Sequence, residues 1–416
     1  MEGTLHAELA RTLRGARAYV LVVLALLYAA VAGLLGVALY RADIDIVDTF
    51  DKHVGDWRIA LGSPRAAAQR PDIAVVLITE ETLLDYESRS PIDRGLVAEL
   101  IRAVDAAEPK AIGVDLIFDR RTRQDTRLIE VLRQAKAPVV LGSVDARVAN
   151  IPAESLTIQD QFLKAAGRPY GHVMLGRKES LLEAYDSVIR YVAQTDRPRP
   201  AVAGASRAAS GGVATAPPPA FADAVAAAIG IAPRPGSRLI SWLRPPDTQT
   251  ELFATLALPR HSPETLKPAL EGLFQPSWRD LLKDRVVLIG ATMIDRDQHA
   301  TPLSVLDHER MPGVLIQAQA LAQRMDGNRD IRELNDWLVA LFSGGVALAC
   351  LLVARRTGLN PHGVFYGLLG VGLIGTTSFL VYWLWRIDVP SIALATAWVL
   401  GGFGGFLSNS LVPRRG

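Results

Sequence analysis

The segment Ile73 to Thr79 reads IAVVLIT, a short apolar run rich in β-branched residues. Such runs are typical of strands that are buried on both faces of a sheet. A helix is predicted soon after it, because Asp93 offers an N-cap. Apolar residues then recur at helical spacing on one face: Val97, Leu100, Ile101 and Val104. The apolar run and this helical spacing together predict a strand followed by a helix.

The same order of elements recurs downstream. Ala111 to Phe118 (AIGVDLIF) is predicted to be a strand, Asp125 to Ala135 a helix, and Pro138 to Gly142 another strand. Alternation of strands and helices indicates a parallel sheet. The sequence therefore predicts an α/β domain.

A later stretch, LKDRVVLIGATMIDRDQHATPLS, covers Leu282 to Ser304. Val286 to Ile289 is predicted to be a buried strand, with Gly290 allowing the backbone to turn and a helix beginning near Pro312. The charged residues thus form a strand-to-helix connection. Because ligands of open α/β sheets bind outside the carboxyl ends of the strands, this loop is a candidate for a site.

Membrane segments flank this domain. The 416 residues are 50% hydrophobic and 21% charged, with a mean hydropathy of +0.20, which is typical of a mixed membrane and water-exposed protein. Uncharged apolar runs are long enough to cross roughly 30 Å of hydrocarbon. They are Tyr19 to Tyr40, Trp337 to Ala354, Pro361 to Trp385 and Val389 to Pro413. The region from Arg41 to Asp336 has no such run and is predicted to be water-exposed.

Arginine placement predicts the orientation, since short basic flanks stay in the cytoplasm. Basic residues precede the first span, separate the second from the third, and follow the fourth: Arg11, Arg14, Arg17, Arg355, Arg356, Arg414 and Arg415. Both termini, residues 1–18 and 414–416, are therefore predicted to be cytoplasmic and the large domain extracytoplasmic. A cleavable signal peptide is the alternative for the first span, but its apolar core exceeds the usual roughly 7 to 15 residues.

Five motifs resemble one family. They are DWRIALG around Asp56, SPIDR at Ser90 to Arg94, PKAIGVDLIFD at Pro109 to Asp119, DSVIR at Asp186 to Arg190, and VVLIGAT continuing to Ala318. In order and spacing they resemble the CHASE domain of type two, a bacterial extracytoplasmic sensory domain. The resemblance covers nearly the whole chain. It implies one span before the domain, three after it, and a bacterial inner membrane.

The resemblance also implies a cytoplasmic output module, such as a nucleotide cyclase, a kinase or a cyclic-dinucleotide enzyme. This sequence ends a few residues after its fourth span, at SNSLVPRRG. We therefore expect the signal to pass to a separate effector protein. The alternative is that the C-terminus is truncated.

Three residues are candidates for binding near the predicted strands. Asp115 interrupts an apolar strand, and a buried carboxylate requires a partner or hydrogen bonds. Arg94 is the candidate partner, in either a structural pair or a ligand site. Asp125 is expected to cap its helix.

Two more candidates, Asp297 and Thr301, lie in the charged stretch from Leu282 to Ser304. Asp295, Asp297 and His299 are close in sequence but lack a defined metal-ligand spacing. We expect no metal there, and instead a solvated loop in which Asp297 accepts hydrogen bonds from backbone amides and Thr301 with Pro302 sets the turn.

Several function classes are disfavoured. The net charge of +2, from 45 Lys+Arg against 43 Asp+Glu, offers no basic field for nucleic acid. The sequence contains no phosphate-binding glycine motif and no G-x-S-x-G elbow, and its only cysteine, Cys350, lies inside a predicted span. We therefore expect no cofactor and no catalysis. An exported hydrolase that uses Asp115 or Asp297 is the third-ranked class.

Two features have a structural explanation, with a contact to another protein as the alternative. Arg197 to Pro219 is rich in Ala, Gly, Ser and Pro, so a flexible insertion is predicted, with a partner-docking loop as the alternative. Gly363 with Gly367, and Gly401 with Gly405, lie four residues apart, which favours close helix packing. This packing lies either within the bundle or in a homodimer.

The function that these observations favour is a membrane-anchored sensor. It detects a small-molecule or protein ligand outside the cell and signals through the separate effector. The alternative is a scaffold subunit of an envelope complex.

Overall fold

The structure is a computed structural model that describes residues 19–20, 22–38, 45–145, 151–176, 188–192, 218–232, 239–273, 276–293, 297–327, 329–357 and 361–411. The described residues fall into two compact units. One is an α/β unit that runs from Ile59 to Ile331, and the other is a helical unit that holds the residues up to Arg58 and from Arg332 onward. Residues 197–217 of the predicted insertion lie outside the described residues.

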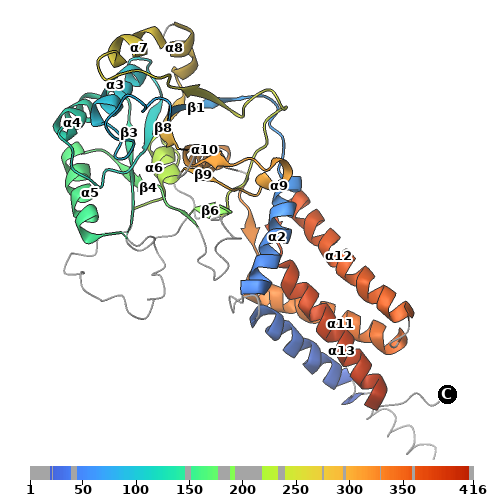
Figure 1. The fold of residues 1–416 in the computed structure, drawn as a ribbon. Coiled ribbons are helices and arrows are strands. Elements are labelled where there is room, and N and C mark those ends of the chain that lie inside the picture. The colour runs from blue at the N-terminus through green and yellow to red at the C-terminus, as the bar shows by residue number, and fades with distance from the viewer. Residues whose placement is uncertain are drawn as a thin grey trace, which may run out of the picture. The chain divides into compact units, whose positions relative to one another are not determined.

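A six-stranded sheet forms the centre of the α/β unit (Figure 1). In spatial order its strands are β4 (Tyr170–His172), β3 (Val139–Ser143), β2 (Ala111–Asp115), β8 (Val286–Thr292), β1 (Arg70–Thr79) and β7 (Phe253–Ala257). Every neighbouring pair is parallel. The predicted α/β class is therefore confirmed.

Helices cover both faces of the sheet, as a parallel sheet requires. On one face the core includes α3 (Arg94–Asp105), α4 (Asp125–Gln134), α5 (Ala153–Ala166) and α7 (Leu266–Leu273). On the other face it includes α6 (Phe221–Ala228) and α10 (Gly313–Asp326). Alternate residues of β1 serve the two cores: Ala74, Val76 and Ile78 face the first, while Ile73 and Val75 face the second. All five are fully buried.

Most predicted elements are present, with shifted ends. The strand predicted for Ala111 to Phe118 ends at Asp115, and Phe118 leaves the sheet to stack on Phe162 of α5 at 4.4 Å between ring centroids. The region Arg244 to Pro276, which has no regular sequence pattern, contains β7 and α7, and α8 (Pro276–Leu282) starts at its end.

Short elements complete the α/β unit. They are α9 (Ser304–Asp307), the antiparallel pair β5 (Leu175–Gly176) and β6 (Tyr191–Val192), and the antiparallel pair β9 (Gln298–His299) and β10 (Met311–Pro312).

The order of the strands creates a switch point. After β1 the chain passes to α3 on one face of the sheet and returns in β2, but β1 and β2 are not neighbours in the sheet. The position between them is occupied by β8, which comes much later in the chain. After β8 the chain passes to α10 on the opposite face. Connections that leave neighbouring strands toward opposite faces leave a crevice at the carboxyl ends of those strands.

Gly290 serves close packing at this point rather than a turn, so the predicted turn is wrong. It lies inside β8, paired with Leu77 and Asp115. A Cβ atom on Gly290 would stand 2.5 Å from Cβ of Val314 on α10. The glycine is therefore needed because the start of α10 passes directly against the strand.

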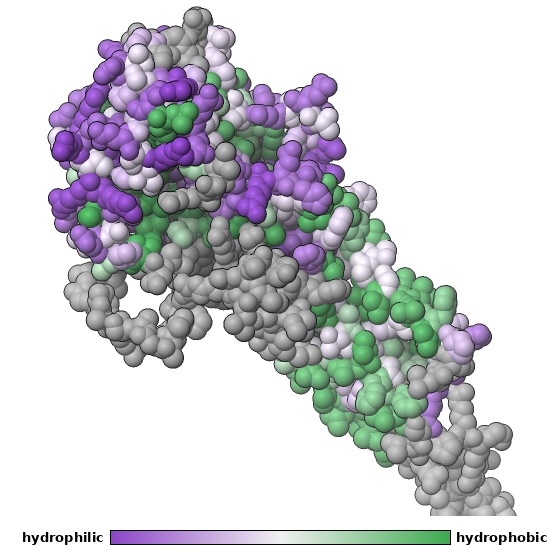
Figure 2. Space-filling view, viewed as in Figure 1, coloured by the Kyte–Doolittle hydropathy of each residue, from purple (hydrophilic) through white to green (hydrophobic). Residues whose placement is uncertain are grey.

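The helical unit contains three helices that are long and apolar enough to cross a membrane: α11 (Asp336–Thr357), α12 (Pro361–Trp385) and α13 (Ser391–Leu411). They match the three predicted C-terminal spans. A shorter apolar helix, Val22–Ala38, lies within the first predicted span. The surface of these helices is mainly hydrophobic, in contrast to the hydrophilic surface of the α/β unit (Figure 2).

Small residues bring these helices close together. A Cβ on Gly401 would meet the backbone of Ala347, and one on Gly405 would lie 2.6 Å from Cβ of Ala354. Both glycines of this pair thus serve contact between α13 and α11 inside one chain, as predicted for packing within the bundle. Gly367 on α12 is different, because a Cβ there would meet nothing within 4 Å.

A buried arginine holds several elements of the helical unit together. Arg58 lies on α2 (Asp45–Gly62), and its guanidinium donates to Oγ of Ser378 at 2.6 Å and to the carbonyl oxygen of Val389 at 2.7 Å. It also forms an ion pair with Asp388. Asp388 belongs to β12 (Ile387–Asp388), which pairs with β11 (Arg332–Glu333) directly before α11. Arg58 therefore connects α2 to the junction of α12 and α13.

Candidate functional site

A cavity of about 350 Å³ occupies the switch point of the sheet. Its walls come from the connection after β1 and from the ends of β2 and β8 with the connections that follow them. The lining residues are 89–92 and Arg94, then residues 115–117 with Asp119 and Arg120, then Ala291, Met293, Asp297 and His299. The first residues of α10 and the segment after β4 close it. Clefts of this size, with a few convergent polar groups, are typical of small-molecule sites.

Arg94 is the most deeply buried charged group of the cavity. It is the first residue of α3, and its position is set by Asp93, whose carboxylate accepts a 2.9 Å hydrogen bond from the amide of Leu96. The Arg94 side chain is only 1% exposed. Its guanidinium lies over the ring of Phe118, 4.5 Å from the ring centroid. The predicted helix cap at Asp93 is thereby confirmed.

The Arg94 guanidinium has little polar compensation for this burial. Its Nε lies 3.5 Å from Oδ1 of Asp125, and its Nη2 is buried without a hydrogen-bond partner in the protein. Burial lowers the pKa of Arg94, against the opposing charges of Asp125, Asp119 and Asp93. An arginine stays protonated even so, because its ordinary pKa lies far above neutral pH. A buried cation with unused donors is suited to bind an anionic group.

Asp125 does not cap α4, so that prediction is wrong. It is the first residue inside the helix, and the residue at the cap position, Gln124, makes no side-chain cap. The Asp125 carboxylate instead accepts hydrogen bonds from the amide of Thr122 at 3.0 Å and from its hydroxyl at 2.8 Å. It thereby orders the turn before α4 and holds a negative charge beside Arg94.

Asp115 does not pair with Arg94, contrary to the pairing suggested by the sequence. It ends β2 opposite Gly290, where it is half-buried and lines the cavity. Burial, followed by repulsion from Asp297, raises the pKa of Asp115 to about 7. The predicted candidate Asp297 therefore lies close enough to Asp115 to raise its pKa.

The loop that carries Asp297 is attached to the start of α10. The amide of Asp297 donates to the carbonyl oxygen of Met293 at 3.0 Å, and its own carbonyl oxygen accepts from the amide of Gly313 at the same distance. Among the residues that the structure describes, no three His, Cys, Asp or Glu side chains gather closely enough to hold a metal ion.

Gln317 is a site residue that the sequence reasoning missed. It lies on α10 and is 1% exposed; its Nε2 donates to the carbonyl oxygen of Val173 at 2.9 Å. Its Oε1 is buried and accepts no hydrogen bond from the protein. Its spacing in the sequence could have identified it, because Gln317 follows the inward-facing Val314 by three residues. This spacing places the amide of Gln317 on the apolar face of the helix.

Thr301 lies outside the cavity. It is 1% exposed and builds the turn into α9, where its amide donates to Oγ of Ser304 at 3.0 Å and its carbonyl oxygen accepts from the amide of Ser304. Its predicted role in the turn is thus confirmed. Of the five candidate residues, the structure brings Arg94, Asp115 and Asp297 to one cavity, places Asp125 behind Arg94, and leaves Thr301 in a structural turn.

The fold and the cavity define a class: a membrane protein with apolar helices and a three-layer α/β domain that has a small-molecule-sized cavity at its switch point. The chain belongs to the CHASE2 domain family, which its sequence matches over residues 22–356. CHASE2 domains are extracellular sensory domains. The chain matches no curated protein and no solved structure.

Proposed function

We propose that this protein is a membrane-anchored sensor whose α/β domain binds a ligand in the switch-point cavity and signals through a separate effector protein. The observation that carries the proposal is the presence of two buried polar atoms without protein partners, Nη2 of Arg94 and Oε1 of Gln317, on residues that line one cavity. Buried polar atoms are normally hydrogen-bonded, so two cavity-lining residues that each keep an unpartnered atom mark this cavity as the candidate ligand site.

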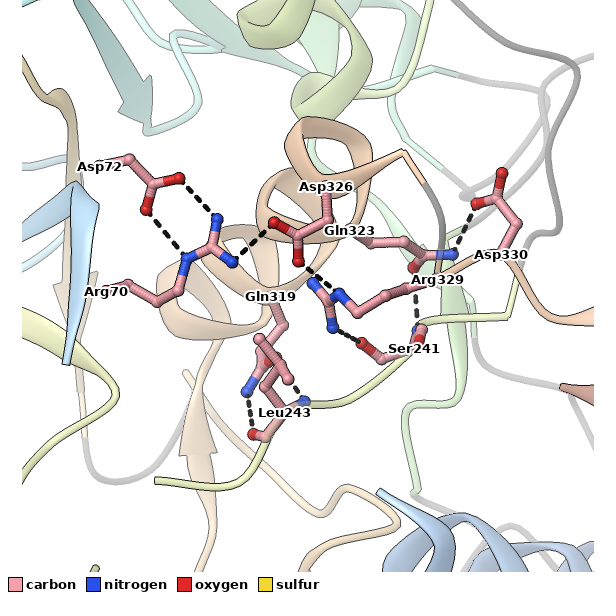
Figure 3. A network of polar contacts seen from close by, with 9 residues as sticks. All are labelled: Arg70, Asp72, Ser241, Leu243, Gln319, Gln323, Asp326, Arg329 and Asp330. Atoms are coloured by element: carbon pink, nitrogen blue, oxygen red, sulfur yellow. Dashed lines mark hydrogen bonds and ion pairs between the residues drawn. The ribbon is translucent and has the colours of Figure 1, made fainter. Parts of the chain in front are cut away.

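Helix α10 connects the cavity to the segment that leads to the membrane helices. Its first turns carry Gln317 and line the cavity. Its later turns carry Gln319 and Gln323, four residues apart on the same face (Figure 3). Gln319 exchanges two hydrogen bonds with the backbone of Leu243, at 3.0 and 2.9 Å. The helix therefore holds the extended segment 239–244 much as a neighbouring strand would.

The end of α10 lies in a network of charged groups (Figure 3). Asp326 accepts from Arg70 at 2.7 Å and from Arg329 at 2.5 Å, and Arg70 also pairs with Asp72. Although burial alone would lower the pKa of Arg70, its hydrogen bonds to Asp72 and Asp326 raise it. Arg70 starts β1, shortly after α2, and Arg329 lies shortly before α11.

This network joins the two places where the chain enters and leaves the α/β domain. A ligand that shifts the start of α10 changes the position of Asp326, because a helix moves as a rigid element. Because Asp326 binds both Arg70 and Arg329, its movement displaces both side chains. These two residues lie near the two segments that connect the α/β domain to the helical unit, so the displacement reaches both connections. A ligand acts in this way only to the extent that it binds one arrangement of α10 more tightly than another.

We further propose a bacterial inner membrane location with both termini in the cytoplasm and the α/β domain outside. Support comes from Arg355 and Arg356 in the last turn of α11, and from the basic residues at both ends of the sequence. Labelling of single cysteines in intact cells tests this topology, in a Cys350→Ala background. Cysteine at the exposed Glu154 should react with an impermeant maleimide, whereas cysteine at the exposed Arg356 should react only after the membrane is opened.

The function itself is tested by filling the cavity. Ala291→Leu adds volume to the cavity wall, and Ala257→Leu on the exposed side of β7 is the matched control. The effector is first identified by cross-linking in native membranes, and its output is then measured for each variant. We expect Ala291→Leu to remove the response to the natural stimulus and Ala257→Leu to preserve it. Equal output from both variants, or an envelope assembly in place of an effector, would favour the scaffold alternative.

A further inference from the structure

The three long apolar helices enclose a second cavity, of about 410 Å³. Helices α11 and α13 are in close contact through small residues such as Gly401 and Ala347. Helix α12 leaves a space beside this pair, and we call that space the inter-helix cavity. One face of each helix lines it: the lining residues lie between 339 and 349 on α11, between 370 and 381 on α12, and between 390 and 398 on α13.

Two contacts between α12 and α13 fix the width of the inter-helix cavity. Near one end, the hydroxyl groups of Ser378 and Ser391 form a hydrogen bond of 3.0 Å. Near the other end, Nε1 of Trp398 donates to the carbonyl oxygen of Gly367 at 3.0 Å, and a Cβ on Gly370 would overlap the Trp398 ring. Moving α12 aside to admit another helix would break both contacts, so the cavity is a fixed part of the fold.

The inter-helix cavity occupies the half of the helices that lies next to the start of α11. On α12 it extends from residue 370 to residue 381 of a helix that ends at Trp385. Trp337, Trp383 and Trp385 are exposed at this end, and tryptophans are enriched at the interface between membrane and water. At about 1.5 Å per residue the cavity is about 16 Å deep. This depth matches one leaflet, about half of the roughly 30 Å of hydrocarbon in a bilayer.

The lining of the inter-helix cavity suits a hydrocarbon. Among the residues that the structure describes, no charged side chain lines it, and its hydroxyl groups are those of Thr377 and Ser378. Phe342 and Leu373, on two different walls, are 52% and 58% exposed. An apolar cavity with so few polar groups does not hold ordered water. Left empty, it would also forfeit the dispersion contacts of its lining.

The dimensions of the inter-helix cavity identify its occupant. A volume of about 410 Å³ over a depth of about 16 Å corresponds to a mean cross-section of roughly 25 Å². A single extended hydrocarbon chain fits this space, whereas an α-helix with its side chains is about 10–12 Å across and does not fit. In a bilayer the chains of phospholipids are far more abundant than any free apolar molecule, so mass action favours them.

We infer that the inter-helix cavity binds one acyl chain of a membrane phospholipid, from the leaflet next to the start of α11. The chain lies between α11, α12 and α13 and completes the packing of α12. Its headgroup lies at the level of the exposed tryptophans. The inference goes beyond the proposed function, because it depends neither on the ligand of the switch-point cavity nor on the effector.

Trp398 provides the measurement, because it lines the deep end of the inter-helix cavity. Trp242 and Trp278 remain in the α/β unit as a constant background. The exposed tryptophans of the helical unit are replaced by phenylalanine: Trp57, Trp337, Trp383 and Trp385.

The full chain is placed in nanodiscs of phosphatidylglycerol in which one acyl chain carries bromine atoms, which quench tryptophan fluorescence on contact. It is then extracted and washed in a detergent without bromine, so that bulk lipid is removed and a bound chain is retained. We expect Trp398 to keep most of its quenching, relative to a sample prepared with unbrominated lipid. Mass spectrometry of the extracted protein should find one phospholipid per chain.

Two variants fill the inter-helix cavity from different walls. Ala349→Phe on α11 and Thr377→Phe on α12 each add a ring to its lining, and both should abolish the retained quenching and the retained phospholipid. Val371→Phe changes an exposed residue of α12 outside the lining; it is the control and should preserve both signals. Circular dichroism verifies that each variant keeps its helices, so that a loss of quenching reports on the cavity.

A photoreactive side chain identifies the occupant directly. Benzoylphenylalanine is introduced in place of Phe342, which lines the inter-helix cavity, and the protein is irradiated in native membranes. The expected product is a phospholipid adduct. An adduct with a free fatty acid, another small apolar molecule, a second copy of the chain or a different protein would overturn the inference.

Two results of the quenching experiment would also overturn it. If Trp398 regains its full fluorescence when the unfilled chain is extracted, only bulk lipid reached it. If the filled variants stay as quenched as the unfilled chain after extraction, the retained lipid binds elsewhere. Neither result bears on the proposed function, which is tested separately through Ala291→Leu and the effector output.

Discussion

Asp115 should make the stability of the α/β domain depend on pH. Its pKa is raised from an ordinary 3.8 to about 7 in the folded chain, first by burial and then by Asp297. Between these two pH values the folded protein binds a proton that the unfolded chain has released. Stability therefore falls as pH rises from about 4 to about 7 and changes little above that range.

The magnitude follows from the size of the shift. About three pKa units at 1.36 kcal/mol each correspond to about 4 kcal/mol. Because Asp115 is only half-buried, solvent relieves part of this penalty. We therefore expect the free energy of unfolding to fall by about 2 kcal/mol as pH rises from about 4 to about 7. Asp115→Asn removes the titrating group while keeping the shape, so the variant should lose this component of the pH dependence.

The assay is urea unfolding of the full chain in detergent at a series of pH values, followed by fluorescence of the buried Trp242 in a background without the other tryptophans. The difference between wild type and Asp115→Asn isolates Asp115 from other titrating groups. Asp297→Asn should retain most of the slope, because burial contributes more than the neighbouring charge. A wild-type minus Asp115→Asn difference that stays constant from pH 4 to pH 8 would refute this reasoning.

Three further changes test other parts of the structure. Gly290→Ala should destabilise the α/β domain by about 1–3 kcal/mol in urea unfolding, because its Cβ would overlap Val314. Asp326→Asn should lower the same free energy of unfolding by about 2 kcal/mol, since Arg70 and Arg329 would lose a shared carboxylate. Arg58→Met should make the helical unit less resistant to unfolding in sodium dodecyl sulfate, by about 2 kcal/mol, measured by circular dichroism.

Each change has a matched control. Gly313→Ala meets only His299 at an ordinary 3.6 Å and should alter stability by less than about 0.5 kcal/mol. Asp160→Asn and Arg356→Met remove exposed charges and should have comparably small effects. If a variant and its control behave alike, the contact assigned to that residue does not stabilise the fold.

The sequence alone determined the class of the main domain and the apolar helices. Buried strands such as Ile73 to Thr79 are recognisable because both faces must be apolar, and the spans are recognisable because hydrocarbon thickness sets their length. The cap at Asp93 was predicted because it depends on neighbouring residues only. These features follow from local spacing, which a sequence records directly.

Strand order and side-chain partners were decided only by the tertiary structure. The insertion of β8 between β1 and β2 creates the cavity, and it joins segments far apart in the sequence. For that reason the charge of Asp297, and no ion pair with Arg94, acts on Asp115; Gly290 allows helix packing rather than a turn, and Gln317 lines a cavity. Arg58 likewise gained its partners, on α12 and in the segment between α12 and α13, through folding. Contacts between distant segments depend on how whole elements pack, and the spacing of residues along one element carries no record of them.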